Sequence, residues 1–478
     1  MGDMFADLAA AYGTRPLFRT DDGAEIAVAA LADLTQRPEI AACRGRLVMC
    51  LSDNDPGGAL GYLALLQAQA VPMMVATGLP TPRLQTLIAA YEPSFLWLPE
   101  ARMADVPDAD LVLSERGYGL LARRTSVAVP LHDDLALLLG TSGSTGSPRF
   151  VRLSQGNLLG NARAIRDYLG IGADDVPVTS LPLTYSYGLS VLHSHLLAGS
   201  TIALTAKTLF DRGFWDFLRD ARVTSFAGVP YHYEMLAKLR FAKMDLPDLR
   251  TMTQAGGRMD PALVRDFAVL CAERNRRLFV MYGQTEATAR MAYLPPDKAA
   301  TKPGSIGQAI PGGELWLEDE DGTRVAEPDR PGQLVYRGPN VALGYAESHA
   351  DLGRGDEWQG LLHTGDLATR DAEGDFTIVG RLKRFVKLFG NRINLQDVEH
   401  ALQAAGHQAV CGGRDDRLDV YLVDADAEVG KQVKKTLAAE LKVTPQAIGV
   451  FAIDRVPRND AGKVLYGLLD GLEKVLLA

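Results

Sequence analysis

The chain has 478 residues and a net charge of −9, from 50 Lys and Arg against 59 Asp and Glu. This length exceeds what one compact core usually supports, so at least two domains are expected. The charges are mixed and form no basic stripe, which argues against a nucleic-acid-binding protein. Apolar residues make up 47% of the chain, an ordinary share for a folded protein.

Short apolar runs alternate with helical patterns over the first three hundred residues. The patterns predict strands at 47–51, 71–75, 95–98, 135–140, 201–204, 223–227 and 278–281, and helices at 61–69, 83–91 and 261–273. Continuous apolar strands that alternate with helices are typical of parallel sheets covered on both faces.

The pattern changes after about residue 295. Short strands at 315–317, 333–336 and 376–379 lie between Gly, Pro and Asp turns and indicate a β-rich subdomain over 296–382. Helices at 395–405 and 428–442 and strands at 420–423 and 449–453 then predict a small α+β domain. The expected fold is therefore α/β, with a large N-terminal domain over 1–382 and a C-terminal domain over 383–478.

The cysteines and the apolar stretches bear on the cellular location. None of the four cysteines forms a C-x-x-C pair, which argues against a zinc cage, and so few suit a reducing cytosol. The N-terminal residues 1–10 hold two acids and no basic residue, unlike a signal peptide. Two uncharged stretches are interrupted by Pro and Gly, so no membrane span is expected, and the predicted location is cytoplasmic.

A loop rich in hydroxyls follows the apolar strand at 135–140. Its residues are Thr141, Ser142, Gly143, Ser144, Thr145, Gly146, Ser147, Pro148 and Arg149. Hydroxyls, glycines, free backbone N–H groups and a cation are the parts that cradle phosphate oxygens. The alternative is a flexible Ser/Gly linker, which rarely follows a buried strand so abruptly. Because no Gly-Lys-Ser/Thr closes the loop, a kinase or GTPase is excluded.

Further motifs follow that loop along the chain. They are Met281-Tyr-Gly-Gln-Thr-Glu286, Gly332-Gln-Leu-Val-Tyr-Arg-Gly-Pro339, His363-Thr-Gly-Asp366, Gly380-Arg-Leu-Lys383 with Gly390-Asn-Arg392, and Pro457-Arg-Asn-Asp-Ala-Gly-Lys463. With the loop, the chain resembles the adenylate-forming (AMP-binding) enzyme superfamily of acyl-CoA synthetases, luciferases and peptide-synthetase adenylation domains. The resemblance implies a large N-terminal domain of two parallel-sheet lobes and a β subdomain, capped by a mobile C-terminal domain.

The resemblance also implies a reaction. A small-molecule carboxylic acid attacks the α-phosphorus of ATP, with Mg²⁺, to give an acyl-adenylate and pyrophosphate. A thiol then takes the acyl group, either coenzyme A or the phosphopantetheine of a separate acyl carrier protein. An amide-forming ligase and a catalytically silent nucleotide-binding relative are the alternatives. Joint retention of Glu286, Asp366, Arg381 and Lys463 argues against the silent relative.

The resemblance implies roles for individual residues of the N-terminal domain. Glu286 would ligate Mg²⁺, which favours carboxylate oxygen, and Thr285 would hold a phosphate. Tyr282 would stack on adenine, with Gly283 and Gln284 in the same motif. The alternative for Glu286 is an acid at a helix start beside a capping Thr. The residues implied for the adenine-contacting loop are Gly256, Gly257 and Arg258.

Roles implied for the C-terminal part concern the ribose, the catalytic lysine and a hinge. Asp366 would accept from the ribose hydroxyls with Arg381 beside it, and the alternative is an ordinary turn Asp. Lys463 would bridge the attacking carboxylate and the α-phosphate, and the alternative is a solvated lysine on the tail. Lys383 would be the hinge, and Arg392 lies in the loop that would enter the site after rotation, although a basic linker is also compatible.

The predicted acyl pocket departs from the family pattern. Thr184 and Tyr185 stand where acyl-CoA synthetases often carry Phe-His, so Tyr185 is the candidate gate, with Tyr187 and Gly188 beyond it. Peptide-synthetase domains place an Asp near Gly188 for an α-amino group, and glycine offers no such charge. A simple carboxylic acid is therefore expected. Arg149 replaces the usual Lys of the phosphate loop.

Overall fold

The computed structural model describes residues 8–125, 128–140, 149–382, 384–389, 391–458 and 464–478. The chain divides into two units, Met1–Leu315 with Tyr336–Leu362, and Trp316–Val335 with His363–Ala478. The second unit thus holds 316–335 and 363–382 together with the predicted C-terminal domain. The predicted boundary between residues 382 and 383 stays a prediction.

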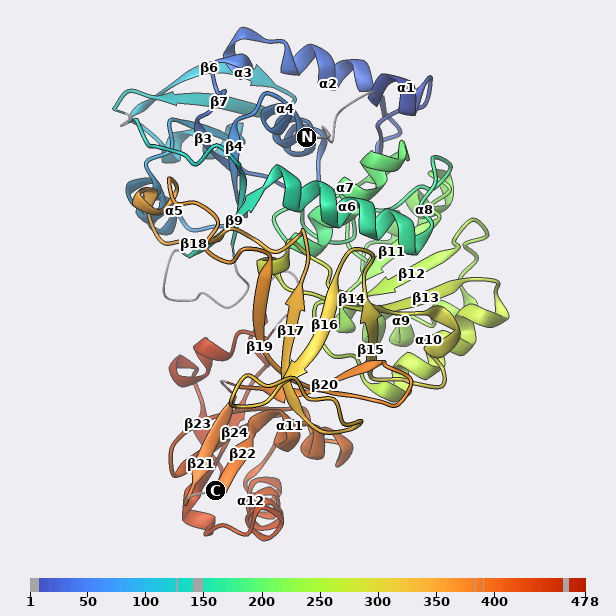
Figure 1. Ribbon diagram of the computed structural model, residues 1–478, viewed down its shortest axis with the longest axis vertical. Coiled ribbons are helices and arrows are strands. Elements are labelled where there is room, and N and C mark those ends of the chain that lie inside the picture. Colours follow the sequence, from blue (N-terminus) through green and yellow to red (C-terminus); the bar gives the residue numbers. More distant parts are fainter. Residues whose placement is uncertain (1–7, 126–127, 141–148, 383, 390, 459–463) are drawn as a thin grey trace. The chain divides into compact units, whose positions relative to one another are not determined.

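An eight-stranded sheet belongs to the first unit, and seven of its strands come from residues 47–154 (Figure 1). Its order is β18 (Gly344–Ala346), β9 (Phe150–Ser154), β8 (Leu135–Gly140), β4 (Val71–Val75), β3 (Leu47–Leu51), β5 (Phe95–Pro99), β7 (Tyr118–Arg123) and β6 (Ala109–Glu115). The four strands β8, β4, β3 and β5 are parallel, as predicted. The strands added at both edges are antiparallel and were not predicted.

Helices cover both faces of this sheet, which explains why β3 is apolar throughout. Val48 and Cys50 pack into the core that contains α4 (Pro56–Gln67), whereas Met49 and Leu51 pack into the core that contains α5 (Thr81–Tyr91). Successive strand residues point to opposite faces, so a strand covered on both sides needs apolar residues at every position. Helix α4 begins five residues before the predicted start because the Asp55 carboxylate caps it, accepting from Gly58 N at 2.7 Å.

The second sheet has nine strands, of which the first unit contains β11 (Ser225–Gly228), β12 (Thr251–Gln254), β13 (Arg277–Tyr282), β14 (Ala292–Leu294) and β15 (Ser305–Ala309), in that order. The first three strands are parallel and the last two antiparallel. One face packs on α8 (Arg212–Asp220), α9 (Pro230–Lys238) and α10 (Pro261–Glu273). The other face packs on α6 (Gln155–Leu169) and α7 (Ser186–Ala198).

Helix α7 is buried on every side from Ser186 to Leu196. Its leucines join the core of the first sheet, whereas Tyr187 and Val191 join the core of the second. Figure 1 shows α6 and α7 running between the two sheets. A helix enclosed all round is normally apolar, so the Ser and His residues of α7 must find partners inside the protein.

A small sheet and three short helices, mostly from residues 8–41, also belong to the first unit. A three-stranded sheet has the order β10 (Ile202–Leu204), β1 (Phe18–Thr20) and β2 (Glu25–Ile26). The short N-terminal helices are α1 (Leu8–Tyr12), α2 (Val28–Thr35) and α3 (Pro38–Ala41).

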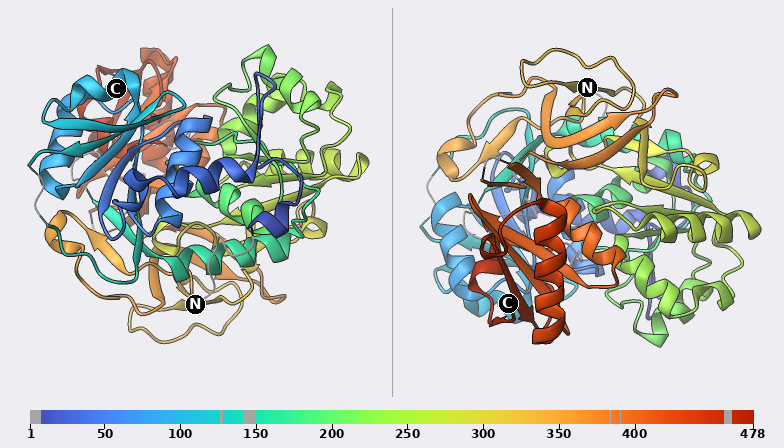
Figure 2. Two further views of the ribbon diagram at one scale, coloured as in Figure 1. Left: turned by 90° about the horizontal axis from the view of Figure 1, so that it is seen from above. Right: turned by 90° about the horizontal axis from the view of Figure 1, so that it is seen from below.

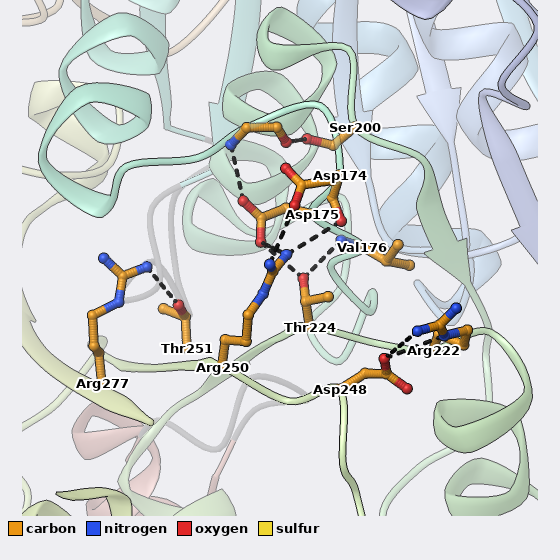
Figure 3. A network of polar contacts seen from close by, with 11 residues as sticks. Asp174, Asp175, Val176, Ser200, Arg222, Thr224, Asp248, Arg250, Thr251 and Arg277 are labelled. Carbon is orange, nitrogen blue, oxygen red and sulfur yellow. Dashed lines mark hydrogen bonds and ion pairs between the residues drawn. The ribbon is translucent and has the colours of Figure 1, made fainter. Parts of the chain in front are cut away.

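A polar network joins the loop after α6 to the second sheet (Figure 3). The Asp175 carboxylate accepts hydrogen bonds from Gly172 N at 2.9 Å, Thr224 Oγ1 at 3.0 Å and Arg250 Nη2 at 2.9 Å. Arg250 also pairs with Asp174, Nη1 to Oδ2 3.2 Å. The charge of Asp175 is therefore already balanced by Arg250.

Four strands that lie wholly or partly in the second unit are neighbours in the order β20 (Phe376–Arg381), β19 (Leu361–Arg370), β17 (Gly332–Arg337) and β16 (Glu314–Glu318). After the hairpin of β21 (Phe385–Leu388) and β22 (Asn391–Asn394), the last sheet runs in the order β23 (Ala409–Arg414), β24 (Arg417–Val423), β25 (Ile448–Ile453) and β26 (Val475–Leu476).

Two helices pack on one face of that last sheet, α11 (Leu395–Ala404) and α12 (Ala427–Leu441) (Figure 2). Leu418, Val420 and Leu422 of β24 point into this core, whereas Tyr421 points into a smaller core on the opposite face. The small α+β domain predicted from the alternation after residue 385 has this architecture. Together the sheets and helices confirm the predicted α/β class.

Candidate active site

The turn after β13 carries the predicted metal ligand. Tyr282 ends the strand, and the Gln284 amide donates to its hydroxyl, Nε2 to OH 3.1 Å. Gly283 has no room for a side chain, since a Cβ there would lie 1.7 Å from the Ala289 carbonyl oxygen. Glycine is thus required for the chain to fold back at this point and to present Thr285 and Glu286.

Helix α7 and the loop after β17 hold this turn from two directions. The hydroxyls of Thr285 and Ser186 are hydrogen-bonded, Oγ1 to Oγ 3.1 Å. The Asn340 amide donates to the carbonyl oxygens of Ala287 at 2.8 Å and Arg290 at 2.9 Å. Thr288 lies between them with φ of 65° and ψ of −60°, a conformation that a β-branched residue rarely adopts. Such strain is typical of functional turns that the surroundings hold in place.

Glu286 contacts a tyrosine that the sequence did not single out. The Tyr345 hydroxyl donates to Glu286 Oε1 at 2.8 Å, and the Arg149 guanidinium lies over the Tyr345 ring, 3.9 Å from its centre. Burial and the Glu286 charge raise the pKa of Tyr345, so it stays a neutral donor. One aromatic ring therefore links the last residue of the predicted phosphate loop to the predicted metal ligand. The signal in the sequence was slight, a Gly-Tyr pair six residues after the Gly332–Pro339 motif.

Arg152, at the centre of β9, fixes the segment that carries Tyr345. Its guanidinium is fully buried, donates to the carbonyl oxygens of Tyr345 at 3.1 Å and Leu343 at 3.2 Å, and pairs with Glu357 at 2.5 Å. Further bonds reach the carbonyl oxygens of Arg354 and Gly355. Since both the charge and the donors have partners, Arg152 acts as a structural clamp on β18.

The predicted adenine-contacting loop follows β12. Gly256 has φ of +82°, and a Cβ there would lie 2.4 Å from the Tyr185 hydroxyl oxygen. Gln254 Nε2 donates to the Gly257 carbonyl oxygen at 2.8 Å, and Arg258 is exposed beyond it. Gly256 thus lies directly against Tyr185, the candidate acyl gate, which brings two predicted sites together.

The three predicted acyl-pocket residues occupy different environments. Tyr185 is partly exposed, whereas Tyr187 is buried and bonded through its hydroxyl to Thr253, OH to O 2.9 Å. Gly188 packs against the preceding loop, where a Cβ would lie 2.3 Å from the Pro182 carbonyl oxygen. No side chain, and hence no Asp for an α-amino group, fits at position 188 without movement of that backbone.

The predicted ribose site lies within the second unit. Asp366 on β19 pairs with Arg381 on β20, Oδ1 to Nε 2.8 Å, and the Asp366 side chain is 2% exposed whereas that of Arg381 is 47% exposed. The Asp366 N–H donates to Thr364 Oγ1 at 3.1 Å, which fixes the turn after His363. A buried carboxylate held by a partly exposed guanidinium is chemically suited to accept from a diol.

Several predicted residues lie outside the described residues. They are Thr141, Ser142, Gly143, Ser144, Thr145, Gly146, Lys383 and Lys463. Arg392 belongs to β22, where it pairs with Lys387 across the hairpin, and its side chain is likewise outside the description. The phosphate loop, the hinge and the catalytic lysine therefore stay predictions.

The donors at Glu286 suit Mg²⁺. Glu286 offers carboxylate oxygen, and Tyr345 bonds to Oε1, which leaves Oε2 for a cation. Across the described ranges no group of three or more His, Cys, Asp or Glu side chains forms a metal cage. A single carboxylate suits Mg²⁺, which usually keeps several waters and binds substrate phosphates as well.

Comparison with known proteins decides the family. Residues 39–346 match the family model described as AMP-binding enzyme. This chain belongs to that family. The indoleacetate–CoA ligase of Aromatoleum aromaticum is 30% identical over 452 residues, 87% of this chain and 86% of that protein. An L-proline–[L-prolyl-carrier protein] ligase of Pseudomonas fluorescens is 30% identical over 70% of this chain and 67% of its own.

Solved structures of the same fold are also found. The o-succinylbenzoate coenzyme A synthetase of Bacillus subtilis in complex with AMP has a TM-score of 0.79 at 22% identity, with 98% of each chain covered. MatB of Rhodopseudomonas palustris with bound ATP has a TM-score of 0.76 at 23% identity, with 97% of each chain covered. These structures confirm the predicted fold of the family.

The family membership confirms further predictions. The relatives are CoA ligases and carrier-protein ligases, so the predicted enzyme class, an AMP-forming acid–thiol ligase, is confirmed for the family, as are its cofactors ATP, Mg²⁺ and a thiol acceptor. No helix within the described ranges combines the length and the apolarity needed to cross a membrane.

Proposed function

We propose that this enzyme activates a small carboxylic acid with ATP as an acyl-adenylate, releases pyrophosphate, and passes the acyl group to the thiol of coenzyme A or of a carrier protein's phosphopantetheine. The contact that carries this proposal is the chain from Arg149 through the Tyr345 ring to Glu286. It joins a cation at the end of the Thr141–Gly146 loop to a carboxylate, as a triphosphate with its metal requires.

Each predicted residue has a place in this reaction. The carboxylate and the triphosphate repel each other, so the site must neutralise charge and align the attack. Arg149 and the preceding loop bind phosphate oxygens, and Thr285 donates to one of them. Glu286 holds Mg²⁺, whose charge offsets that of the phosphates. Asp366 and Arg381 bind the ribose, and Tyr282, with the Gly256–Arg258 loop, encloses the adenine.

The C-terminal residues complete the proposal. Lys463 neutralises the attacking carboxylate and the α-phosphate, and rotation about Lys383 replaces it with the thiol-binding face that includes Arg392. The Thr141–Gly146 loop, Lys383 and Lys463 keep these roles as proposals from their motifs alone. The boundary between residues 382 and 383 is proposed for the same reason.

The relatives support a thiol acceptor and leave the acid open. Those named above act on indoleacetate and L-proline, and an oxalate–CoA ligase of Arabidopsis thaliana is 29% identical. For this chain we propose an acid without an α-amino group, because Gly188 has no space for a counter-charge. Four free, buried cysteines and a requirement for ATP support a cytoplasmic location.

This function can be tested by identifying the product that the enzyme forms from ATP. With Mg²⁺, ATP and a panel of carboxylic acids, the purified enzyme should form AMP and pyrophosphate and should exchange labelled pyrophosphate into ATP. The adenylate retains the AMP group, so ADP is not expected. Formation of ADP, or the absence of acid-dependent exchange across the panel, would contradict the proposal.

A further inference from the structure

Arg290 is a buried cation without a counter-ion among the described residues. It follows β13 by eight residues, and its side chain is 2% exposed. Its one hydrogen bond joins Nη1 to Ser190 Oγ at 3.4 Å, and Nε is enclosed without any partner. Its guanidinium lies over the Tyr187 ring, 3.8 Å from the centre. Arginine stays charged in proteins, and an uncompensated buried charge is unfavourable.

The acid that could balance this charge is engaged elsewhere. Asp175 lies near His195, since its charge raises the pKa of His195 whereas the charge of Arg290 lowers it. Its oxygens, however, bind Arg250, Thr224 and the Gly172 N–H (Figure 3). His195 itself is neutral, because burial lowers its pKa to about 4. No anion of the described chain is therefore left for Arg290.

The position of Arg290 connects it to the candidate acyl pocket. Its positive charge counters the rise in pKa that burial causes in Tyr185 and Tyr187, the two aromatic residues predicted to line that pocket. It is the fourth residue after Glu286, so its Cα lies within about 14 Å of the Cα of the proposed metal ligand. Asn161 and Asn340 bind its backbone and hold it there. Its contact with the Tyr187 ring therefore places the charge beside a residue of the predicted pocket.

A small cavity lies between α7 and the Glu286 turn, next to the partner of this charge. Its volume is about 10 Å³, enough for about one water molecule. Its lining includes Ser186 and Thr288 beside the Glu286 turn, and Ser190, the hydrogen-bond partner of Arg290.

We propose that Arg290 binds a second anionic group of the acid, so that the substrate is a dicarboxylic acid of which one carboxylate is adenylated and the other pairs with this guanidinium. This inference rests on the proposed function and specifies its substrate class. The protein without substrate leaves the cation unbalanced, and the bound diacid supplies the missing charge. A monocarboxylic acid of the same length would leave Arg290 as it is.

Matched diacids and monoesters test this assignment. We would measure pyrophosphate exchange with malonate, succinate, glutarate and adipate, each against its monomethyl ester, for the parent enzyme, Arg290→Met and Arg290→Lys. The parent should prefer one diacid, and Arg290→Met should reduce the diacid-to-ester ratio of kcat/KM by roughly 30- to 1,000-fold, as for a lost buried charge pair. Arg290→Lys should retain part of the preference. An unchanged ratio in Arg290→Met would overturn the assignment.

Arg276→Met is the matched control. Arg276 is also buried beneath an aromatic ring, Phe241, but its guanidinium donates to the Leu246 carbonyl oxygen at 2.8 Å, in the core under α10. This variant should keep the diacid-to-ester ratio of the parent. An equal loss in both variants would attribute the effect to general disturbance of the core and would overturn the assignment.

A binding measurement separates this inference from the proposed function. The preferred diacid, without nucleotide, should raise the melting temperature of the parent and not that of Arg290→Met. Such a shift without pyrophosphate exchange for any acid would contradict the proposed function and support the anion site. No shift for any of the four diacids, together with equal use of esters, would overturn the site.

Discussion

Two buried arginines of the first unit differ in how completely they are bonded. Arg152 pairs with Glu357 and donates to four carbonyl oxygens, whereas Arg290 has one long hydrogen bond and an aromatic face. Both are almost fully enclosed. Burial alone therefore does not separate a structural cation from a binding cation, but the presence of a counter-ion does.

The same contrast extends to the two sides of the Glu286 turn. The loop that carries Asn340 and Tyr345 makes several well-formed hydrogen bonds to the turn. Helix α7 contributes a bond between the Ser186 and Thr285 hydroxyls and accepts the long bond of Arg290 at Ser190, and it leaves His195 Nε2 without a partner among the described residues. We infer that the loop, more than α7, fixes the metal ligand.

Replacement of the two buried arginines should give the largest difference in stability. Arg152→Met should lower the free energy of unfolding by about 3–5 kcal/mol, because it leaves several buried carbonyl oxygens and Glu357 without their donor. Arg290→Met should lower it little or raise it, since it removes an unbalanced charge. Urea denaturation of both variants at neutral pH measures this difference. A larger loss in Arg290→Met than in Arg152→Met would reverse the interpretation.

The next effect compares the loop side and the helix side of the turn. Tyr345→Phe should reduce adenylate formation roughly 10- to 100-fold and raise the Mg²⁺ concentration needed, because a hydrogen bond to a charged group contributes about 1.5–3 kcal/mol. Ser186→Ala removes a hydrogen bond between neutral groups and should reduce the rate of adenylate formation roughly fivefold. Single-turnover rates across a Mg²⁺ titration distinguish a positioning role from a general loss. An unaltered Mg²⁺ dependence in Tyr345→Phe would argue against its contact with the metal ligand.

The smallest effect concerns pH and depends on α7. Burial lowers the pKa of His193 to about 3 and that of His195 to about 4, so both are neutral in the folded protein. The unfolded chain binds these protons below about pH 6.5, so stability is full above that pH and falls as the pH drops from 6.5 toward 4. Each histidine contributes a slope of about 1.4 kcal/mol per pH unit in that window.

A double variant, His193→Gln with His195→Gln, tests this pH dependence. Glutamine at position 193 can keep a hydrogen bond to Tyr62, which His193 Nε2 makes at 2.8 Å. Unfolding monitored from pH 4 to 7 should show a shallower slope in the variant than in the parent. Equal slopes would show that other groups govern the acid sensitivity of this region.

The sequence predicted much of the fold because local signals and burial agreed. The strands at 47–51, 71–75 and 135–140 are apolar at every position, as strands covered on both faces must be, and the structure has them at these residues. The edge strands β6 and β7 were missed. In β6 exposed and buried positions mix around a bulge between Leu111 and Leu113, so the strand has no continuous apolar run.

For the candidate site, the residue types and their order along the chain could be predicted from the sequence. The contacts that each site residue makes depend on the tertiary structure. The motifs identified Glu286, Asp366 and the Gly256 loop, since spacing within a turn is a local property. Tyr345 and Arg290 carried no such pattern, although a lone Arg in the apolar run of 287–294 was a signal of buried charge. Their roles depend on contacts with distant segments. Tyr345, for example, belongs to the loop at 343–357, which Arg152 holds from about two hundred residues away. Whether a buried charge is balanced is a property of the folded protein, because the partners meet only through long-range packing.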